Sequence, residues 1–204
     1  MIESSVQAAL EELKGSVQLH HDYTKFLLEI NHYPLDYLAV AVLNRSLSLI
    51  SGFCTLIENE NFVAAMALVR LQLDNCLRFS AIWLTENPQE FAMQIIGGTK
   101  VEKIKDRDGN LMRDSYLRDK MNKEYPWVTS VYNHTSGYIH LSNRHISSAM
   151  RPGAEDHTVE IKVGIKDQFV TADEYLEAIG AVTEITQILL GYVNHWGCTK
   201  RGAA

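Results

Sequence analysis

Two consecutive segments of the chain, residues 35–58 and 62–86, are apolar on nearly every face of the helices that their composition predicts. A short polar turn at residues 59–61 separates them, so we expect the two helices to run antiparallel. A helix that is apolar all round must be buried against other elements. The pair therefore predicts a mainly α-helical protein with these two helices at the centre of a bundle.

Four charged side chains lie within this apolar pair: Arg45, Arg70, Asp74 and Arg78. The last three are spaced by four residues and share one helix face, and the antiparallel turn places Arg45 level with residue 75. Three guanidinium groups around one carboxylate leave a positive charge that a phosphate or carboxylate ligand could neutralise. The alternative is an internal salt-bridge network that is completed by another carboxylate, such as Asp36 or Glu184.

Length and composition favour a single domain, because the chain has 204 residues, 46% of them hydrophobic, with only 12 glycines and 4 prolines. Helical periodicity predicts further helices at residues 2–30, 88–96, 126–143 and 172–196. We expect a bundle of about five to six helices over residues 1–198, with an exposed, charged excursion at residues 97–124 that contains one short helix. Residues 199–204 are expected to form a flexible tail.

The periodicity of the chain changes before the last helix. Apolar residues alternate with charged ones at Val159, Ile161 and Val163. This period of two predicts a β-strand, and residues 146–151 could form its partner across a turn at Pro152 and Gly153. The sequence thus predicts a small β-hairpin at residues 145–166, between the last two core helices.

Charge and cysteine content bear on where the protein works. The formal net charge of −6 provides no overall positive field to attract nucleic acid or an anionic membrane. The three cysteines are far apart and are expected to be reduced: Cys54, Cys76 and Cys198. The start of the chain lacks the pattern of a secretion signal, and Asp36, Asn44 and Arg45 interrupt the first apolar segment. We therefore expect a cytoplasmic protein without a membrane span.

A second group of candidate residues lies within residues 132–145. It combines Asn133, His134, Tyr138, His140, Arg144 and His145. Imidazoles titrate near neutral pH and suit general acid or base catalysis, and Arg144 could stabilise charge on a phosphate. The alternative is that these histidines cap helices or pack as polar groups.

The spacing of the histidines does not predict a metal site. No pair within residues 132–145 has the i, i+3 or i+4 spacing that aims two ligands at one ion. Glu29-x-x-His32 has the form used twice in di-iron bundles but occurs once. His20 and His21 point to different faces of their helix and are expected at the surface. We therefore expect no metal and no other cofactor.

Two segments, Val69–Arg78 (VRLQLDNCLR) and Ser136–Ser142 (SGYIHLS), resemble uncharacterised bacterial helical proteins of the HEPN-like class. The resemblance spans residues 35–145. Many HEPN-like proteins are metal-independent ribonucleases of toxin and antiphage defence systems, and they dimerise so that two Arg-x(4–6)-His motifs form one site. The resemblance therefore implies a homodimer that acts on RNA or nucleotides, with His140 at the position of the family's histidine.

This chain departs from the HEPN motif before His140, because Asn133 and His134 stand where the family has an arginine. Arg151 and His157 have the required spacing, but the Pro-Gly pair between them favours a turn, whereas the family's motif lies on a helix. A member that lacks catalysis, or one whose arginine comes from another helix, is compatible with this pattern.

Two hypotheses for function follow. In the first, the protein is a metal-independent endoribonuclease in which His140 is the general acid or base and Arg144 or Arg78 stabilises the phosphate. Its other binding residues would be Arg45, Arg70, Asp74, Asn133, His134 and Tyr138. In the second, the protein is a non-enzymatic binding or interaction module whose arginine cluster binds a small anion or only stabilises the fold. An enzyme should expose His140 and an arginine together in a cleft, whereas a structural cluster should be closed and paired.

Overall fold

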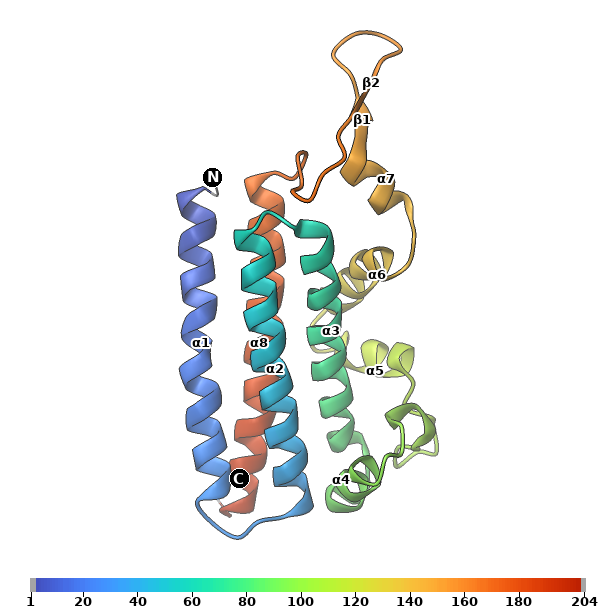
Figure 1. The fold of residues 1–204 in the computed structure, drawn as a ribbon. Coiled ribbons are helices and arrows are strands. Elements are labelled where there is room, and N and C mark those ends of the chain that lie inside the picture. Colours follow the sequence, from blue (N-terminus) through green and yellow to red (C-terminus); the bar gives the residue numbers. More distant parts are fainter. Residues whose placement is uncertain (1–2, 203–204) are drawn as a thin grey trace.

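The computed structural model describes residues 3–202 and is mainly α-helical with one small hairpin, which confirms the predicted fold class. Four long helices form a bundle: α1 (Ser4–Leu28), α2 (Pro34–Glu58), α3 (Phe62–Ser80) and α8 (Ala172–Lys200). They pack in the order α1, α2, α3, α8, and α8 lies against α1 again (Figure 1). The predicted antiparallel pair thus forms two neighbouring helices of a four-helix bundle.

The starts of these helices follow from local sequence signals. Pro34 occupies the first position of α2, where its missing N–H leaves no intrahelical hydrogen bond unmade. The Asn61 side chain accepts a hydrogen bond from a backbone N–H in the first turn of α3. Thr171 and Glu174 form a reciprocal capping box at the start of α8. All three helices therefore begin within one residue of the predicted positions.

Three shorter helices cover α3 and one side of α2: α4 (Pro88–Ile96), α5 (Asp114–Met121) and α6 (Val128–Ile139). Two 3₁₀ turns accompany them, at Ala81–Leu84 and Val101–Lys103. The helix predicted at residues 62–86 therefore ends at Ser80 and tightens into the first of these turns. The helix predicted at residues 126–143 is also shorter, and only two of its side chains, Val128 and Thr135, are buried.

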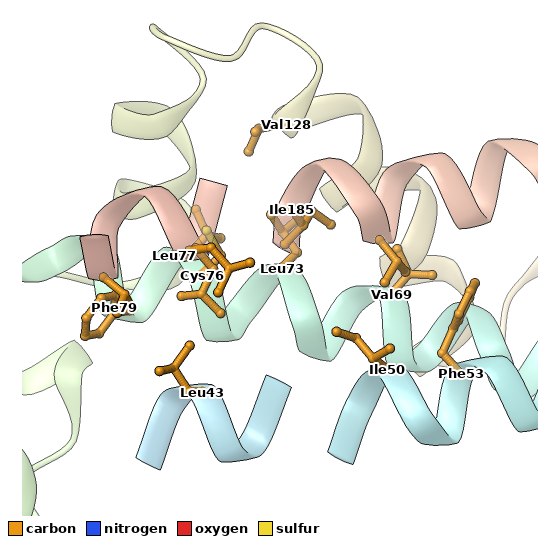
Figure 2. Close-up of a cluster of buried hydrophobic side chains, with 14 of the residues drawn as sticks. Leu43, Ile50, Phe53, Val69, Leu73, Cys76, Leu77, Phe79, Val128 and Ile185 are labelled. Atoms are coloured by element: carbon orange, nitrogen blue, oxygen red, sulfur yellow. The ribbon is translucent and has the colours of Figure 1, made fainter. Parts of the chain in front are cut away.

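The hydrophobic core lies between the four long helices, and Figure 2 shows its part between α2, α3 and α8. Its large buried side chains include Leu43, Ile50, Phe53, Val69, Leu73, Leu77, Phe79 and Ile185. Burial of each such side chain contributes about 1.5–3 kcal/mol relative to exposure. Because α3 packs on α2 and α8 and also on α5 and α6, it is the central helix of the molecule.

The segment predicted to be an exposed excursion, residues 97–124, is partly buried. Its buried apolar side chains include Ile104, Met112 and Leu117. The Asp106 carboxylate accepts hydrogen bonds from the backbone N–H groups of Asp108 and Asn110, which holds the turn that precedes α5. The predicted short helix is present as α5, but the expectation of an exposed segment is wrong for its apolar strip, which packs on α3 between the charged residues.

A buried polar layer connects all four long helices through Ser46 of α2. The Ser46 hydroxyl donates to Nε2 of His20 in α1 at 2.9 Å and accepts from Nε2 of Gln72 in α3 at 2.7 Å. Gln72 Nε2 also donates to Thr186 Oγ1 of α8 at 3.1 Å. The Ser16 carbonyl accepts from His20 Nδ1, which selects this imidazole tautomer. The expectation that His20 lies at the surface is wrong, because its ring completes this interior layer.

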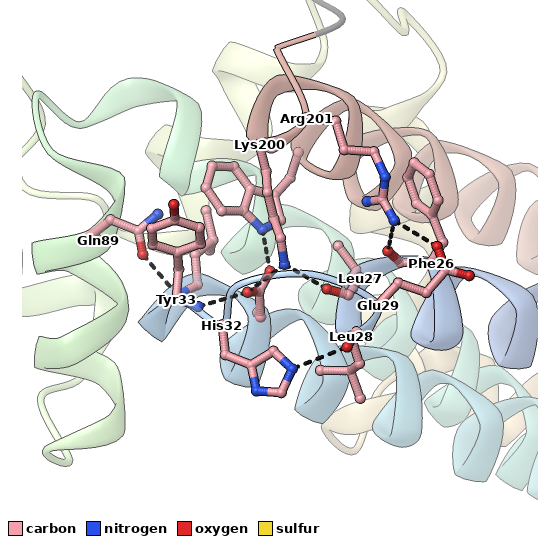
Figure 3. Close-up of polar contacts among 12 residues, drawn as sticks. Phe26, Leu27, Leu28, Glu29, His32, Tyr33, Gln89, Lys200 and Arg201 are labelled. Carbon is pink, nitrogen blue, oxygen red and sulfur yellow. Dashed lines mark hydrogen bonds and ion pairs between the residues drawn. The ribbon is translucent and has the colours of Figure 1, made fainter.

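A buried ion pair closes the end of the bundle where α1 leads into α2 (Figure 3). Lys200 of α8 donates to Asp36 Oδ2 of α2 at 2.8 Å, and both side chains have no exposed surface. Trp196 Nε1 donates to Asp36 Oδ1, also at 2.8 Å. Lys200 donates a second hydrogen bond to the Leu27 carbonyl of α1. One lysine therefore joins the ends of three helices.

This arrangement corrects the predicted flexible tail at residues 199–204. The last helix extends to Lys200, and the Arg201 guanidinium donates to the Phe26 carbonyl of α1 and to Glu29, which follows that helix. The sequence predicts a frayed end at Gly197 and beyond, but the charge of Lys200 is paired with Asp36 of α2, and that of Arg201 with Glu29, the residue after α1. Residues 203–204 lie outside the described residues.

The hairpin lies between α6 and α8, as predicted, but its elements have different bounds from those predicted. A short helix, α7 (Asn143–Ala149), occupies most of the expected first strand, and the strands are β1 (Met150–Pro152) and β2 (Val159–Ile161). The register pairs Met150 with Ile161 and Pro152 with Val159. Pro152 is therefore a strand residue, and residues 153–158 form the turn. The strand prediction failed because Ser142 caps α7 and starts a helix there.

Two of the bundle helices, α2 and α8, are long and apolar enough to cross a membrane by length and composition alone. In the structure, 33% of the apolar window of α2 and 50% of that of α8 are buried. Core helices of soluble bundles share these properties. The absence of a membrane span and the cytoplasmic location therefore stay predictions.

Candidate functional site

The first candidate site is a cavity of about 470 Å³ between α2, α3 and α4, here called the α2–α3–α4 cavity. Its walls are mainly apolar and include Leu38, Val42, Phe79, Phe91, Ile95 and Val101. Two of the predicted site residues, Arg45 from α2 and Arg78 from α3, line it together with Lys100 and Glu102. The size and the apolar walls suit a small molecule with a few polar groups.

The charges at this cavity are incompletely balanced. Arg78 makes a bidentate contact with Asp114 of α5, through Nε at 3.1 Å and Nη2 at 3.0 Å. Lys100 Nζ lies 3.9 Å from Glu102, a loose and exposed pair. Arg45 has no hydrogen bond or ion pair within the described part of the chain. Three cations thus stand against two carboxylates, with one guanidinium left without a partner.

The other two residues of the predicted cluster, Arg70 and Asp74, are largely shielded from solvent and paired with each other. Arg70 and Asp74 form an ion pair on α3 in which the two side chains are 10% and 13% exposed. The Arg70 guanidinium also stacks on the Tyr132 ring of α6, 3.8 Å from its centroid. Burial raises the pKa of Asp74, and the Arg70 charge opposes that shift. This pair packs α6 against α3 and does not line the α2–α3–α4 cavity.

The four residues of the predicted cluster do not lie together, because different faces of α3 contact different neighbours. Arg45 lies near α3 as expected from the turn, since the amide of the neighbouring Asn75 donates to the Val42 carbonyl of α2. Arg70 and Asp74, however, face α6, whereas Arg78 reaches both Asp114 and the cavity. A spacing of four residues drifts around the helix, so three such positions contact different neighbours.

The second candidate site is a smaller cavity of about 240 Å³ between α3, α6 and α8, here called the α3–α6–α8 cavity. His134 and Tyr138 of α6 and Arg144 of α7 line it. Arg144 Nη2 donates to His134 Nδ1 at 3.1 Å, and the rings of His134 and Tyr138 lie 5.7 Å apart. Gly137 permits this approach of α7, because a Cβ there would lie 3.0 Å from Arg144 Cγ.

The electrostatics of this cavity favour a neutral imidazole. Partial burial and the nearby Arg144 charge lower the pKa of His134 below its ordinary value. Because a guanidinium only donates, His134 Nδ1 must accept, and the ring proton lies on Nε2. Burial also raises the pKa of Tyr138, so its hydroxyl stays protonated. The site can thus donate hydrogen bonds to an anion, while Glu174 and Glu177 at its border limit its positive charge.

The structure does not bring His140 together with an arginine. His140 follows the last residue of α6, is exposed, and lines none of the cavities described here. Asn133 is also exposed and outside both cavities. His145 accepts a hydrogen bond from the Ser142 backbone N–H and helps to cap α7, which is the structural role weighed for these histidines. The roles predicted for His140 and Asn133 stay predictions.

A third cavity was not anticipated from the sequence. Its aromatic lining comes from Trp83, Tyr125, Tyr192 and His195, and its volume is about 730 Å³. The indole ring of Trp83 meets the His195 ring edge-on at 4.8 Å. No sequence motif predicts this site, because its residues come from three separate parts of the chain. Each of them alone resembles an ordinary half-buried aromatic residue.

Cysteines and metal-binding groups add no further site. Burial raises the pKa of Cys76 strongly and that of Cys54 to about 11, so both thiols stay protonated near neutral pH. Among residues 3–202, no group of three or more His, Cys, Asp or Glu side chains is placed to hold a metal ion.

Comparisons with protein-family models, curated proteins and solved structures found no match to this chain. The similarity to HEPN-like proteins therefore rests on the two short segments alone.

Proposed function

We propose that the protein binds a small amphipathic anion in the α2–α3–α4 cavity. The ligand would have an anionic head group, such as a carboxylate, and an apolar body. The observation that carries this proposal is Arg45, a cation that has no partner among residues 3–202 and lines a mainly apolar cavity. A carboxylate that reached Arg45 would form a charge-assisted hydrogen bond, the strong class of such bonds.

The surroundings of Arg45 support this ligand class. Arg78 and Lys100 add positive charge along the same cavity, in a chain whose net charge is −6. Hydrogen bonding to Asp114 raises the pKa of Arg78, which keeps that guanidinium charged at every physiological pH. The apolar walls behind these cations would shelter a hydrocarbon body from water. A purely inorganic anion would leave most of the cavity unfilled.

Decanoate is a suitable first probe, because it joins a carboxylate to a flexible apolar chain. We expect calorimetric titration to show binding of decanoate that is at least about tenfold tighter than binding of decanol or acetate. Arg45→Gln and Arg78→Gln should each weaken decanoate binding by about 10- to 100-fold, because a hydrogen bond to a charged group contributes about 1.5–3 kcal/mol.

Lys25→Gln is the charge-matched control, because it removes one exposed cation from α1, a helix that contributes no residue to the cavity. This variant should bind decanoate like the wild type. Equal binding of decanol and decanoate, or equal losses in all three variants, would contradict the proposal.

RNA cleavage is the second candidate function, in line with the role that the HEPN resemblance implies. It is supported by the contact between His134 and Arg144 at the α3–α6–α8 cavity, where an Nε2–H and guanidinium N–H groups could meet one phosphate. In this role the neutral His134, once released from its contact with Arg144, would accept the proton of the attacking hydroxyl at Nδ1. The imidazolium formed in this way would then protonate the leaving oxygen, and Arg144 would stabilise the developing charge on the phosphate.

A cleavage assay on a broad RNA panel tests this second candidate. It predicts that His134→Gln abolishes cleavage, whereas His140→Ala, which changes an exposed residue outside the cavities, leaves it unchanged. The opposite pattern would place the reaction at His140, as the resemblance implies. No cleavage by the folded wild type would remove the enzymatic candidate and leave anion binding.

We also propose that the protein is soluble in the cytoplasm. The proposal rests on α2 and α8, whose apolar sides pack within the bundle and whose ends carry the Asp36–Lys200 pair, and on cysteines that are free in the structure. Fractionation without detergent should leave the protein in the supernatant. Recovery only in a carbonate-resistant membrane fraction would contradict this location.

A further inference from the structure

The segment from α7 through the hairpin exposes an unusual amount of apolar surface. Figure 1 shows it projecting beyond the end of the bundle. Of the 17 exposed large apolar side chains among the described residues, 8 lie between residues 139 and 165. Leu141 is 92% exposed, and Val163 and Ile165 are each 91% exposed. We call residues 139–165 the arm.

The two faces of the hairpin differ in a way that its register explains. Directly opposite residues share a face, so Met150 and Ile161 lie on one side of the ladder, and Pro152 and Val159 lie on the same side. None of these four carries a charge, and Val163 continues the same period of two along the chain. One face of the hairpin is therefore entirely apolar, and its side chains are exposed.

The other face is polar, and its charges are paired within the chain, although its side chains remain 35–53% exposed. Arg151 and Glu160 form an ion pair across the ladder at 2.7 Å, and Lys162 reaches the same carboxylate at 3.0 Å. The Arg151 guanidinium stacks on the ring of Phe169, 4.4 Å from its centroid. A two-stranded hairpin is marginal in water unless a hydrophobic face is covered. The apolar face of this hairpin has no such covering element among the described residues.

We propose that the arm is a dimerisation surface and that a second copy of this chain covers its apolar face. The eight exposed apolar side chains of the whole arm, of which four lie on the hairpin face, together present on the order of 900 Å², whereas one partner of a standard interface contributes about 800 Å². The largest patch on a typical monomer is only about 300–600 Å². The arm thus supplies the area that a stable dimer needs.

The charge of the arm favours a second copy of this chain over nucleic acid, an acidic protein or a membrane as its partner. The arm contains three basic and three acidic side chains, so it has no net charge to attract nucleic acid, an acidic protein or an anionic membrane. Its tip carries Glu155, Asp156 and His157, all exposed, which opposes insertion into a bilayer. Two apolar hairpin faces related by a two-fold axis are self-complementary and pack as a small sandwich.

Sedimentation equilibrium of the full chain over about 1–100 μM tests the proposal. The wild type should be a dimer. The double variant Ile161→Glu, Val163→Glu should raise the dimer Kd by about 100-fold or more, because each charge would be buried unpaired in the interface. Leu19→Glu is the matched control, because it places the same charge at an exposed apolar site, 50% exposed, on α1 and away from the arm.

The variants change exposed residues, so circular dichroism should show unchanged helicity. The conservative pair Ile161→Val, Val163→Ile keeps the apolar face and should remain dimeric. A wild type that stays monomeric up to 100 μM would overturn the proposal, and so would a dimer that the two glutamates leave intact. Binding of a monomeric wild type to neutral lipid vesicles would assign the arm to a membrane surface instead.

Discussion

Arg70 and Arg78 lie two turns apart on α3 but differ in their surroundings. Arg70 is 10% exposed, paired with Asp74 and stacked on an aromatic ring, whereas Arg78 is 44% exposed and paired with a partly exposed Asp114. Removal of Arg70 leaves the Asp74 carboxylate in a site whose burial already raises its pKa. Removal of Arg78 leaves Asp114 in contact with water.

We therefore expect Arg70→Ala to lower the free energy of unfolding by about 3–5 kcal/mol. Arg78→Ala should lower it by about 1 kcal/mol or less, because solvent screens the exposed pair. Urea unfolding followed by circular dichroism measures both values. Similar losses for the two variants would show that the Arg78 contact is also a closed structural pair, which would weaken the case for an open anion site.

His20 makes stability depend on pH. Burial lowers the pKa of His20 below its ordinary value of 6.5, partly opposed by the hydrogen bond to Ser16 and aided by His21. Below pH 6.5 the unfolded chain therefore binds a proton that the folded protein does not. The free energy of unfolding should fall as pH falls from 6.5 to the lowered pKa, by at most about 1.4 kcal/mol per pH unit from this group.

The measurement is urea unfolding of wild type, His20→Gln and His21→Gln between about pH 5.5 and 7.5. His20→Gln should flatten the pH dependence, because glutamine does not titrate. His21→Gln should retain it, because His21 is exposed. A slope that survives in His20→Gln would assign the effect to another group, and His134, whose pKa is also lowered, would be the first to test.

Two glycines of α8 have opposite roles in the packing of that helix. A Cβ at Gly197 would clash with the Phe26 ring, so α1 and α8 approach each other closely at this point. A Cβ at Gly180 would meet no atom within 4 Å, and that position is exposed. The same substitution therefore has different consequences at two sites of one element.

We expect Gly180→Ala to stabilise the protein by about 0.5–1 kcal/mol, because alanine loses less backbone entropy in a helix. Gly197→Ala should destabilise it by about 1–3 kcal/mol, the usual effect of overpacking. Thermal unfolding of both variants gives the sign directly. Stabilisation by Gly197→Ala would show that α1 moves away from α8 at little cost.

At the scale of elements, the sequence predicts helices well where capping residues mark their ends. Pro34 and Asn61 place α2 and α3 within one residue, because each signal acts on the backbone next to it. The predictions of secondary structure fail where one segment carries signals for both a helix and a strand. Ser142 and His145 cap α7 in a segment whose apolar residues also fit a strand.

The candidate sites were harder to predict than the helices that carry them. Charged residues within apolar helices predicted that Arg45 and Arg70 are paired or face a site, but not which of these applies to each. Whether each arginine is paired depends on which face of α3 meets α2, α5 or α6. The positions of α5 and α6 cannot be predicted from local sequence patterns. His20 and Lys200 are further examples, because the groups that bury them, Ser46 and Asp36, belong to other helices.

At the scale of the whole molecule, the Asp36–Lys200 pair joins the last turn of α8 to the start of α2 and, through the Leu27 carbonyl, to the end of α1. It therefore connects the last helix of the chain to the first two. Because these contacts are buried, their loss should affect the entire bundle and not only the last helical turn.

Lys200→Met tests this connection, because it keeps the length of the side chain and removes its charge. The unpaired Asp36 should lower the free energy of unfolding by about 3–5 kcal/mol, as for other buried pairs broken on one side. For a chain of this size, each kcal/mol shifts Tm by about 2–4 °C, so calorimetry should show one cooperative transition roughly 6–20 °C lower. Adding Asp36→Asn removes the uncompensated charge and should recover part of that loss. Fraying of the last turn alone, with the main transition unmoved, would mean that α8 is held by its apolar contacts and that the ion pair contributes little to the bundle.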